Sequence, residues 1–354
     1  MNILFLNSAS RDWGGNEQSI FIAANALAEY HTIILGYRNE LLGRHFTIRK
    51  YKLPFFFEAD LYTIFSLTGI VRKHRIEVII STKRKDYAIG GIVARICGIK
   101  NVIWLGANRQ LKKHFLNQLV YKKLAAGIIV NARQIKETLF ETPFMLKQNI
   151  RVIYNGIDTK KLDQAKKTPD SPEGKFTVTA MGRIDRNKGF DFLLRSFARF
   201  LSLKPDIKAE LVIIGDGPLR EEYEMLTKDL QLQESVRFTG FLSDPYPELL
   251  FSDVFVSSSI SEGLSIAILE AMYLLNAPVS TFAGGGIAEI IEHGRNGFLC
   301  DYGDETALSE ILLNLYGNIE LRTAVAEKAK ISVAERYSLQ NMALEISDFC
   351  HSSC

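Results

Sequence analysis

The chain has 354 residues, of which 47% are hydrophobic, and this is enough for two cores of ordinary size. Its four cysteines show no CxxC spacing, which argues against a zinc site or a disulfide scaffold and fits a reducing compartment. There is no apolar run of about 18 residues that would predict a transmembrane helix. Since the N-terminus also lacks the pattern of a signal peptide, we expect a cytoplasmic protein.

Charge is divided unevenly along the chain. Residues 1–151 hold 23 Lys and Arg against 10 Asp and Glu, whereas residues 152–354 hold 20 against 30. A basic first half favours an anionic partner, such as a membrane surface, a phosphorylated acceptor or nucleic acid. A solvated basic surface without a partner is the alternative. Because the basic residues form no recognisable nucleic-acid-binding module, we expect no nucleic-acid partner.

The first half alternates short apolar runs with segments of helical length. The runs predict strands that are apolar on both faces, at 3–7, 31–37, 77–81, 101–106, 127–131 and 151–156. Helical patterns between them include 16–30, 60–75 and 108–126. This alternation predicts a parallel sheet that is covered by helices on both sides.

A polar segment then interrupts the pattern. Residues 159–175 contain two prolines and a glycine and predict a linker. Strand patterns resume at 176–182, 210–215, 235–240, 252–259, 277–281 and 297–301. We therefore expect two doubly wound, Rossmann-like α/β domains, 1–158 and 176–335, that face each other across an interdomain cleft. The C-terminal segment 336–354 contains an amphipathic helix that suits packing on either domain.

Three turns between a strand and a helix carry residues that suit phosphate binding. Gly14 and Gly15 precede a helix, whose N-terminal N–H groups attract anions, although a tight turn is the alternative. Arg183 and Lys188 flank a strand-to-helix junction, where two fixed cations suit a diphosphate leaving group, although a solvated loop is the alternative. The GDGP turn (215–218) lacks the third glycine of a dinucleotide fingerprint. A packing role and a position beside a nucleotide base are both open for it.

The stretch SEGLSIAILEAM holds two glutamates eight positions apart, Glu262 and Glu270. In a continuous helix they would lie about 12 Å apart along the axis and about 80° apart around it, too far to share a proton or a metal ion. With Ser265 as the N-cap, Glu262 falls in the loop, and the N–H groups of Gly263, Leu264 and Ser265 lie between the two carboxylates. A carboxylate, an anion cradle and a second carboxylate match the order of a sugar, a diphosphate and a ribose. Two glutamates at the ends of an amphipathic helix are the alternative, but Glu270 lies among apolar residues, an odd place for an unpartnered carboxylate.

Several motifs follow one another in a specific order. They are NGID, GRIDRNKG, IIGDGPLREEYE, VRFTGFLSD, SEGLSIAILEAM and PVSTFAGGGIAEIIEHGRNGFL. On these motifs the chain resembles the retaining nucleotide-sugar glycosyltransferases of glycosyltransferase family 4, over nearly its whole length and most strongly over residues 151–302. The resemblance implies the GT-B fold, with an acceptor-side first domain, a donor-binding second domain and a final helix that crosses back to the first domain.

The resemblance also implies roles for the site residues. Glu270 would hold the donor ribose, and Glu262 would lie beside the donor sugar. Arg183 and Lys188 would contact the diphosphate and, with Glu262, form the catalytic set. The helix N-terminus around Gly263, Leu264 and Ser265 would also bind the donor. The Gly14-Gly15 turn would approach the diphosphate and the acceptor from across the cleft.

No metal ion and no cofactor besides the nucleotide-sugar substrate are implied, since fixed cations and helix N-termini stabilise the leaving nucleoside diphosphate. Front-face attack, with the departing phosphate accepting the acceptor proton, would explain why no pair of the Ser-His-Asp kind is evident. One departure concerns the loop after the strand at 101–106, where many members carry a histidine. This chain has Ala107, Asn108 and Arg109 there. Asn108 or Arg109 would then face the donor sugar or the acceptor.

We therefore expect a retaining, hexosyltransferase-type enzyme that transfers a sugar from a nucleoside diphosphate sugar to a glycan acceptor, in lipopolysaccharide core or another surface polysaccharide. An apolar and basic surface at 38–75 would rest on an anionic membrane, at its inner face, and meet a lipid-linked acceptor; a buried core segment is the alternative. A GT-B sugar-nucleotide epimerase and a non-catalytic nucleotide-sugar-binding subunit are the other functions that fit. The set of Arg183, Lys188, Glu262 and Glu270 favours transfer over both.

Overall fold

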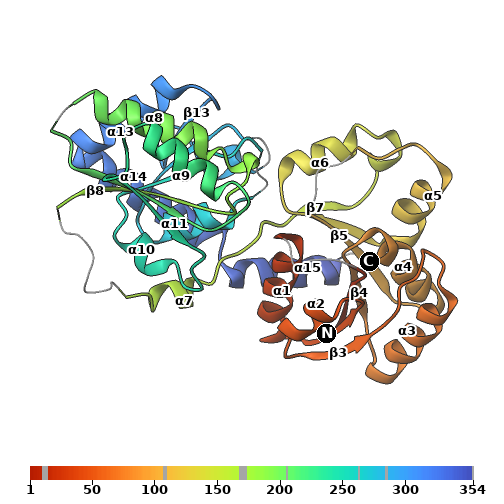
Figure 1. Cartoon of the computed structure of the whole chain (residues 1–354). Helices are drawn as coiled ribbons and strands as arrows, with labels where there is room; N and C mark the ends of the chain where they lie inside the picture. Colours follow the sequence, from red (N-terminus) through yellow and green to blue (C-terminus); the bar gives the residue numbers. More distant parts are fainter. Residues whose placement is uncertain are drawn as a thin grey trace. The chain divides into compact units, whose positions relative to one another are not determined.

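The computed structural model describes residues 1–9, 15–106, 110–166, 174–204, 206–261, 264–283 and 286–352, apart from the side chains at positions 15, 16 and 41. The chain forms two compact α/β units (Figure 1). The first comprises Met1–Gly156 and Leu339–Cys354, and the second comprises Ile157–Ser338.

Within its described residues, the first unit contains a seven-stranded parallel sheet in the order β3-β2-β1-β4-β5-β6-β7. Its strands are β1 (Asn2–Asn7), β2 (Thr32–Tyr37), β3 (Arg49–Lys52), β4 (Val78–Ser81), β5 (Lys100–Leu105), β6 (Gly127–Val130) and β7 (Ile150–Val152). In β1, Ile3 and Phe5 face one apolar layer, whereas Leu4 and Leu6 face the other. Because successive side chains of a strand point to opposite faces, both faces of this sheet need a covering of helices.

The helices supply that covering. They are α1 (Gly15–Ala28), α2 (Glu40–His45), α3 (Leu61–His74), α4 (Arg84–Cys97), α5 (Phe115–Gln118), the π-helix η1 (Leu119–Leu124), α6 (Arg133–Phe140), the short 3₁₀-helix η2 (Pro143–Met145) and α15 (Leu339–Ser352). In Figure 1, α15 lies beside α1, and its apolar side chains, such as Ile346 and Phe349, are buried in the same core as Ile3 and Phe5. Helices α3 and α4 cover the other face.

Two elements of the first unit differ from the sequence prediction. Strand β3 was not predicted, because this edge strand is basic and mostly exposed and so lacks an apolar pattern. The prediction of a single helix at 108–126 was wrong. The described part of that range forms a loop at 110–114, then α5, and then η1.

The second unit contains, in its described residues, a six-stranded parallel sheet in the order β10-β9-β8-β11-β12-β13. Its strands are β8 (Phe176–Met181), β9 (Ala209–Ile214), β10 (Val236–Gly240), β11 (Val254–Ser257), β12 (Ala277–Thr281) and β13 (Phe298–Cys300). Its helices are α7 (Thr159–Asp163), the 3₁₀-helix η3 (Arg186–Lys188), α8 (Phe190–Ser202), α9 (Arg220–Asp229), α10 (Tyr246–Leu250), α11 (Ile266–Tyr273), α12 (Ile287–Ile290), α13 (Glu305–Gly317) and α14 (Ile319–Arg336). Helix α7 lies in the segment that we expected to be a linker, and Asp158 caps it by accepting a hydrogen bond from the Lys161 N–H at 3.0 Å.

Strand order reverses between β1 and β4 in the first sheet and between β8 and β11 in the second. Doubly wound folds bind ligands at the carboxyl ends of the strands at such a switch point. In the second unit, a ligand site is therefore expected at the loops that follow β8 and β11.

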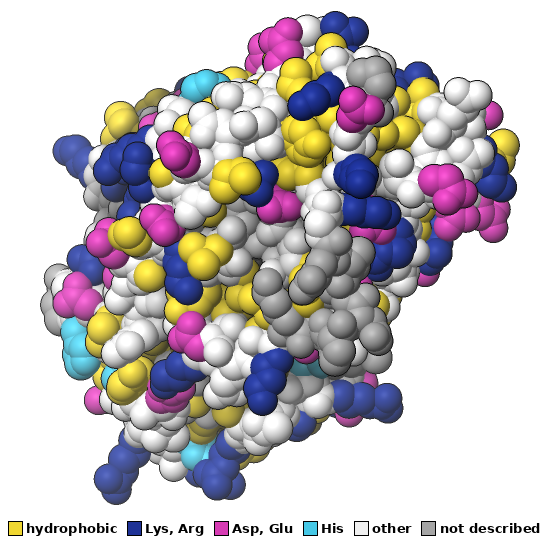
Figure 2. Space-filling model, turned by 90° about the vertical axis from the view of Figure 1, so that its left-hand side faces the viewer, with side chains coloured by type: hydrophobic (Ala, Val, Ile, Leu, Met, Phe, Trp, Pro, Cys, Tyr) yellow, Lys and Arg dark blue, Asp and Glu magenta, His cyan; other side chains and the backbone are white. Residues whose placement is uncertain are grey.

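No helix in the described part of the chain is long and apolar enough to span a membrane. Figure 2 shows one face of the molecule, on which basic and acidic side chains are interspersed with hydrophobic ones. On that face, neither basic nor acidic side chains form a single continuous surface.

Candidate functional site

The loop after β8 carries Arg183 and Lys188 at the carboxyl edge of the second sheet. Arg183 is exposed and Lys188 is partly buried. Gly189 ends η3 with a φ of 61°, in the left-handed region that favours glycine. A Cβ at this position would also lie 2.3 Å from the Ser258 carbonyl oxygen. The loop therefore needs glycine here to pack against the chain that follows β11.

Hydrogen bonds tie this loop to the loop after β11. The Ser258 hydroxyl donates to the Lys188 carbonyl at 2.8 Å. The Asn187 side-chain amide donates to the Ser261 carbonyl at 2.7 Å, and the Ile260 N–H donates to the Asn187 carbonyl at 2.8 Å. The GRIDRNKG and SEGLSIAILEAM motifs, about 75 residues apart in sequence, are thus side by side at the switch point.

Glu270 lies on α11 and is partly buried. The Tyr246 hydroxyl, from α10, donates to Glu270 Oε1 at 3.0 Å. The Lys161 ammonium, from α7, lies 4.9 Å from the centre of the Tyr246 ring. Burial raises the pKa of Glu270 to about 7, although the Tyr246 hydrogen bond and the charge of Lys161 oppose this shift. Glu270 is therefore a carboxylate that is held in one orientation and is close to half ionised at neutral pH.

The sequence signalled neither Tyr246 nor Lys161 as a partner of Glu270. Tyr246 lies 24 residues before Glu270, on a different helix, and no spacing links them. The only signal was that a glutamate among apolar residues needs a partner.

Helix α11 begins directly after Ser265, as predicted, and Leu264 precedes it. Ser265 has the extended backbone of an N-cap residue, yet its side chain makes no capping hydrogen bond. The side chain of Leu264 is buried and packs against Gly286, where a Cβ would lie 3.0 Å from Leu264 Cδ1. A ligand at this helix start would therefore meet the main chain of Leu264 rather than its side chain.

The glycines of the GDGP turn serve close backbone packing. Gly215 has a φ of 137°, and a Cβ there would lie 1.9 Å from the Gly182 carbonyl oxygen. A Cβ at Gly217 would lie 2.3 Å from the Ile184 carbonyl oxygen. The Ile184 N–H also donates to the Asp216 carbonyl at 2.9 Å. Of the two alternatives, packing therefore has direct structural support.

The same turn also lines a pocket. This pocket of about 440 Å³ lies where β8, β9 and β10 end, between Gly182, Gly215, Asp216 and Leu242. Phe241, which is 80% exposed, forms part of its wall. Since the pocket also includes Arg183, it adjoins the loop that carries both cations. A flat apolar ring fits such a wall.

Several predicted residues lie outside the described residues. They are Gly14, Asn108, Arg109, Glu262 and Gly263. Gly15 is described only as the first residue of α1. Among the residues that are described, no group of three or more His, Cys, Asp or Glu could hold a metal ion, and metal independence stays a prediction.

In the first unit, the carboxyl ends of β1 and β4 hold a buried polar cluster that the sequence analysis missed. Asp86 is fully buried and accepts hydrogen bonds from the backbone N–H groups of Ser8 at 3.2 Å and Lys83 at 2.9 Å. Burial raises the pKa of Asp86 to about 6, although these hydrogen bonds oppose the shift. Lys83 also forms an ion pair with the buried Glu17 of α1. The cluster lies at the switch point of the first sheet.

Comparison with known proteins identifies the second unit. Residues 161–332 match the family of glycosyl transferases group 1. This range includes Arg183, Lys188, Tyr246 and Glu270, and it covers almost all of the second unit. The second unit is a glycosyl transferases group 1 domain.

The chain is also similar to glycosyltransferases of Campylobacter jejuni and Rhizobium meliloti. It is 30% identical to the N-acetylgalactosamine-N,N'-diacetylbacillosaminyl-diphospho-undecaprenol 4-alpha-N-acetylgalactosaminyltransferase of Campylobacter jejuni, over 68% of this chain and 64% of that protein. It is 31% identical to the lipopolysaccharide core biosynthesis glycosyltransferase LpsE of Rhizobium meliloti, over 62% of this chain and 63% of that protein. The chain therefore matches less than two thirds of the length of these relatives.

A solved structure matches the whole chain. HepE of Anabaena, in complex with UDP, superposes over 99% of this chain and 100% of that one, with a TM-score of 0.81 and 22% sequence identity. The predicted fold class is thereby confirmed: the glycosyl transferases group 1 domain belongs to a chain with the two-domain GT-B fold. HepE has also been solved in complex with UDP-glucose.

Proposed function

We propose that this protein is a retaining glycosyltransferase that moves a hexose from a nucleoside diphosphate sugar to a glycan or lipid-linked acceptor. One observation carries the proposal. The loop with Arg183 and Lys188 is hydrogen-bonded to the loop that leads into α11 and Glu270, at the switch point of the second sheet. Two cations and an oriented carboxylate at this edge suit a diphosphate and a ribose.

The donor would lie along this edge of the second unit. Its base would enter the pocket beside Phe241, its ribose hydroxyls would donate to Glu270, and its diphosphate would meet Arg183 and Lys188. The Tyr246 hydroxyl would keep the Glu270 carboxylate turned to the ribose. The complexes of HepE with UDP and UDP-glucose support a nucleotide sugar as the class of ligand.

Transfer would proceed by front-face attack. The bond between the sugar C1 and the phosphate oxygen breaks while the acceptor oxygen bonds to C1 on the same face. The departing phosphate oxygen accepts the acceptor proton, and Arg183 and Lys188 stabilise the charge that grows on the diphosphate. With fixed cations in this role we expect no metal requirement. Glu262 would lie beside the donor sugar.

The acceptor would approach the first unit. Helix α3 buries Ile64 and Leu67 in the core, but it exposes Leu61, Tyr62 and Phe65, which are 77%, 68% and 82% exposed. The segment 38–75 thus has both the apolar surface and the core face that the sequence left open. An exposed apolar surface in a basic region supports contact with an anionic membrane at its inner face. The cytoplasmic location remains a prediction.

The relatives support a surface glycan as the acceptor. The Campylobacter jejuni protein is named for a diphospho-undecaprenol acceptor, and LpsE is named for lipopolysaccharide core biosynthesis. We therefore propose lipopolysaccharide core or another surface polysaccharide as the product. Glycosyltransferase family 4 is the family that we predict within this group.

Calorimetric titration with a panel of nucleotide sugars, beginning with UDP-glucose, tests the proposal. One nucleotide family should bind, and Glu270→Ala should weaken its binding by at least about tenfold, because one well-formed set of hydrogen bonds to a charged group contributes roughly 1.5–3 kcal/mol. Glu327→Ala, which removes an exposed carboxylate from α14, is the matched control and should bind normally. If no nucleotide sugar binds to the folded protein, the proposed function is wrong.

Sugar transfer distinguishes the enzyme from the other two functions. An epimerase would convert the nucleotide sugar without an acceptor, and a binding subunit would retain the donor without turnover. Release of free nucleoside diphosphate that requires a glycan or lipid-linked acceptor supports transfer. Inversion at the anomeric carbon of the product would overturn the retaining mechanism.

A further inference from the structure

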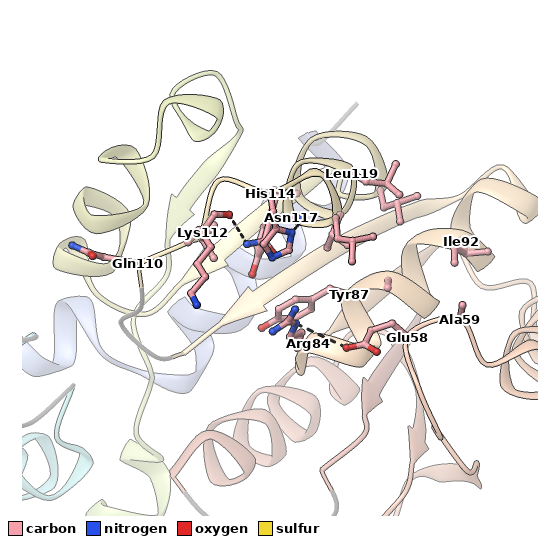
Figure 3. Close-up of a pocket in the computed structure, with 16 residues that line it drawn as sticks. Glu58, Ala59, Arg84, Tyr87, Ile92, Gln110, Lys112, His114, Asn117 and Leu119 are labelled. Atoms are coloured by element: carbon pink, nitrogen blue, oxygen red, sulfur yellow. Dashed lines mark hydrogen bonds and ion pairs between the residues drawn. The ribbon is translucent and has the colours of Figure 1, made fainter.

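The first unit contains a second pocket, separate from the one beside Phe241. It has a volume of about 520 Å³ and lies between α4 and the segment that comprises the loop at 110–114, α5 and η1 (Figure 3). Apolar side chains form most of its wall, among them Tyr87, Ile92 and Leu119. Its size falls within the range of about 300–1,000 Å³ that is typical of sites for small ligands. The proposed donor site uses none of these residues.

Specific features of the chain build this pocket. A Cβ at Gly91 of α4 would lie 2.4 Å from Leu124 Cβ, so glycine is needed for η1 to approach α4 this closely. The Tyr87 hydroxyl donates to the Trp104 carbonyl at 3.2 Å and holds the ring against the end of β5. The η1 segment is a π-helix, a rare conformation that often occurs at functional sites.

The pocket has a polar end and an apolar end. Helix α4 follows β4, so Arg84, its first residue, lies at the carboxyl edge of the sheet. Ile92 lies eight residues further on, about 12 Å along the helix and away from that edge. Figure 3 shows Lys112, His114 and Asn117 grouped on one side of Tyr87, and Ile92 on the other. The polar end is therefore the end that adjoins the switch point, where a sugar acceptor would react.

Two cations mark the polar end. Arg84 Nε lies 4.0 Å from Glu58 Oε1, and both side chains are more than half exposed. Because such an exposed ion pair contributes little to stability, Arg84 can leave Glu58 and bind another anion at a small cost in free energy. Lys112 is exposed, and its carbonyl accepts a hydrogen bond from the Asn117 side-chain amide at 2.8 Å, which orders the loop. Arg84 and Lys112 together suit a phosphate group.

Exposed apolar side chains flank the pocket. Phe56 and Phe57 directly precede the lining residues Glu58 and Ala59, and they are 63% and 55% exposed. On the other side Phe115 of α5 is 75% exposed. Large exposed apolar side chains around an apolar pocket are typical of a surface that meets lipid.

From this arrangement we propose that the pocket binds the single aliphatic chain of a lipid-phosphate acceptor. The chain lies between α4 and η1, the phosphate meets Arg84 and Lys112, and the flanking phenylalanines rest in the lipid from which the acceptor comes. This inference rests on the proposed transferase function and assigns the class of its acceptor. The pocket then presents the acceptor head at the carboxyl edge of the first sheet.

Calorimetry with farnesyl phosphate, farnesol and inorganic phosphate tests the proposal on the full chain. Farnesyl phosphate should bind best, because it fills both ends of the pocket. Leu119→Glu places a charge beside the chain and should weaken binding at least tenfold. Leu146→Glu makes the same change at a leucine that is 61% exposed and does not line the pocket, and it should leave binding unchanged. Lys112→Ala should weaken the binding of farnesyl phosphate several-fold and leave the binding of farnesol unchanged.

Three results would overturn the assignment. The first is equal binding of farnesyl phosphate by Leu119→Glu and Leu146→Glu. The second is failure of the wild type to bind farnesyl phosphate. The third concerns competition for labelled farnesyl phosphate. If a soluble short-chain phosphatidylglycerol, which has two chains, displaces it as effectively as unlabelled farnesyl phosphate does, the pocket binds membrane phospholipid instead.

Nucleotide-sugar binding, measured on the same samples, separates this inference from the proposed function. Leu119→Glu should bind the nucleotide sugar like the wild type and retain its unfolding midpoint. Loss of farnesyl phosphate binding with intact nucleotide-sugar binding is the result that the proposal requires. If the wild type binds nucleotide sugars but no lipid phosphate, the assignment of the pocket to a lipid is wrong, whereas the proposed function is unaffected.

Discussion

The carboxyl group of Glu270 should make nucleotide-sugar binding depend on pH. Burial raises its pKa to about 7. If only the ionised form accepts both ribose hydroxyls, the competent fraction rises from about 9% at pH 6 to about 91% at pH 8. The Kd for the nucleotide sugar should therefore fall about tenfold over this range, which corresponds to ~1.4 kcal/mol. Ligand-free stability should change in the opposite sense, decreasing as pH rises from about 4.5 to about 7, because the folded state retains a proton that the unfolded chain has lost.

Isothermal titration calorimetry with a nucleotide sugar is the suitable assay, since a nucleotide sugar, unlike free UDP, has no terminal phosphate that titrates near pH 6. Glu270→Gln should abolish the pH dependence. Tyr246→Phe removes a hydrogen bond that stabilises the carboxylate, so it should move the midpoint above that of the wild type. A tenfold change that persists in Glu270→Gln would refute the reasoning, and so would tighter binding at pH 6 than at pH 8.

Three further predictions concern catalysis and folding. Arg183→Ala combined with Lys188→Ala should lower kcat by about a hundredfold or more, because it removes charge from the leaving diphosphate, while the unfolding midpoint should stay near that of the wild type. Gly189→Ala should lower the free energy of unfolding by more than Gly294→Ala, since both positions have a positive φ but only Gly189 is crowded by a backbone oxygen. The strain of a positive φ alone costs about 1–2 kcal/mol at either position. Equal losses of unfolding free energy for the two variants in urea denaturation would contradict this. Burial raises the pKa of Asp86 to about 6, so wild-type stability should decrease as pH rises from about 4 to about 6, whereas Asp86→Asn should show a flatter profile in the same titration.

The architecture of each sheet could be read from local sequence pattern. Strand β1, with apolar side chains on both faces, required helices on both sides, and the structure has them. The sequence also predicted where these residues lie along the chain, because Arg183 directly follows a predicted strand and both Lys188 and Ser265 fall between a predicted strand and the helix after it. Strand β3 and the π-helix η1 were missed for a physical reason. The first pairs at an exposed edge without an apolar stripe, and the second has an apolar pattern that does not differ from that of an α-helix.

The sequence by itself thus determined two parallel α/β units and the order of the motifs along the chain, since burial on both faces of a strand and glycine at strand-to-helix turns are local requirements. Only the tertiary structure decided that Tyr246 orients Glu270, that the GDGP glycines pack against the loop at 182–184, and that α4 and η1 enclose an apolar pocket. These features depend on contacts between residues far apart in sequence, and the pKa of a carboxyl group depends on how deeply such contacts bury it. Neither spacing nor composition contains that information.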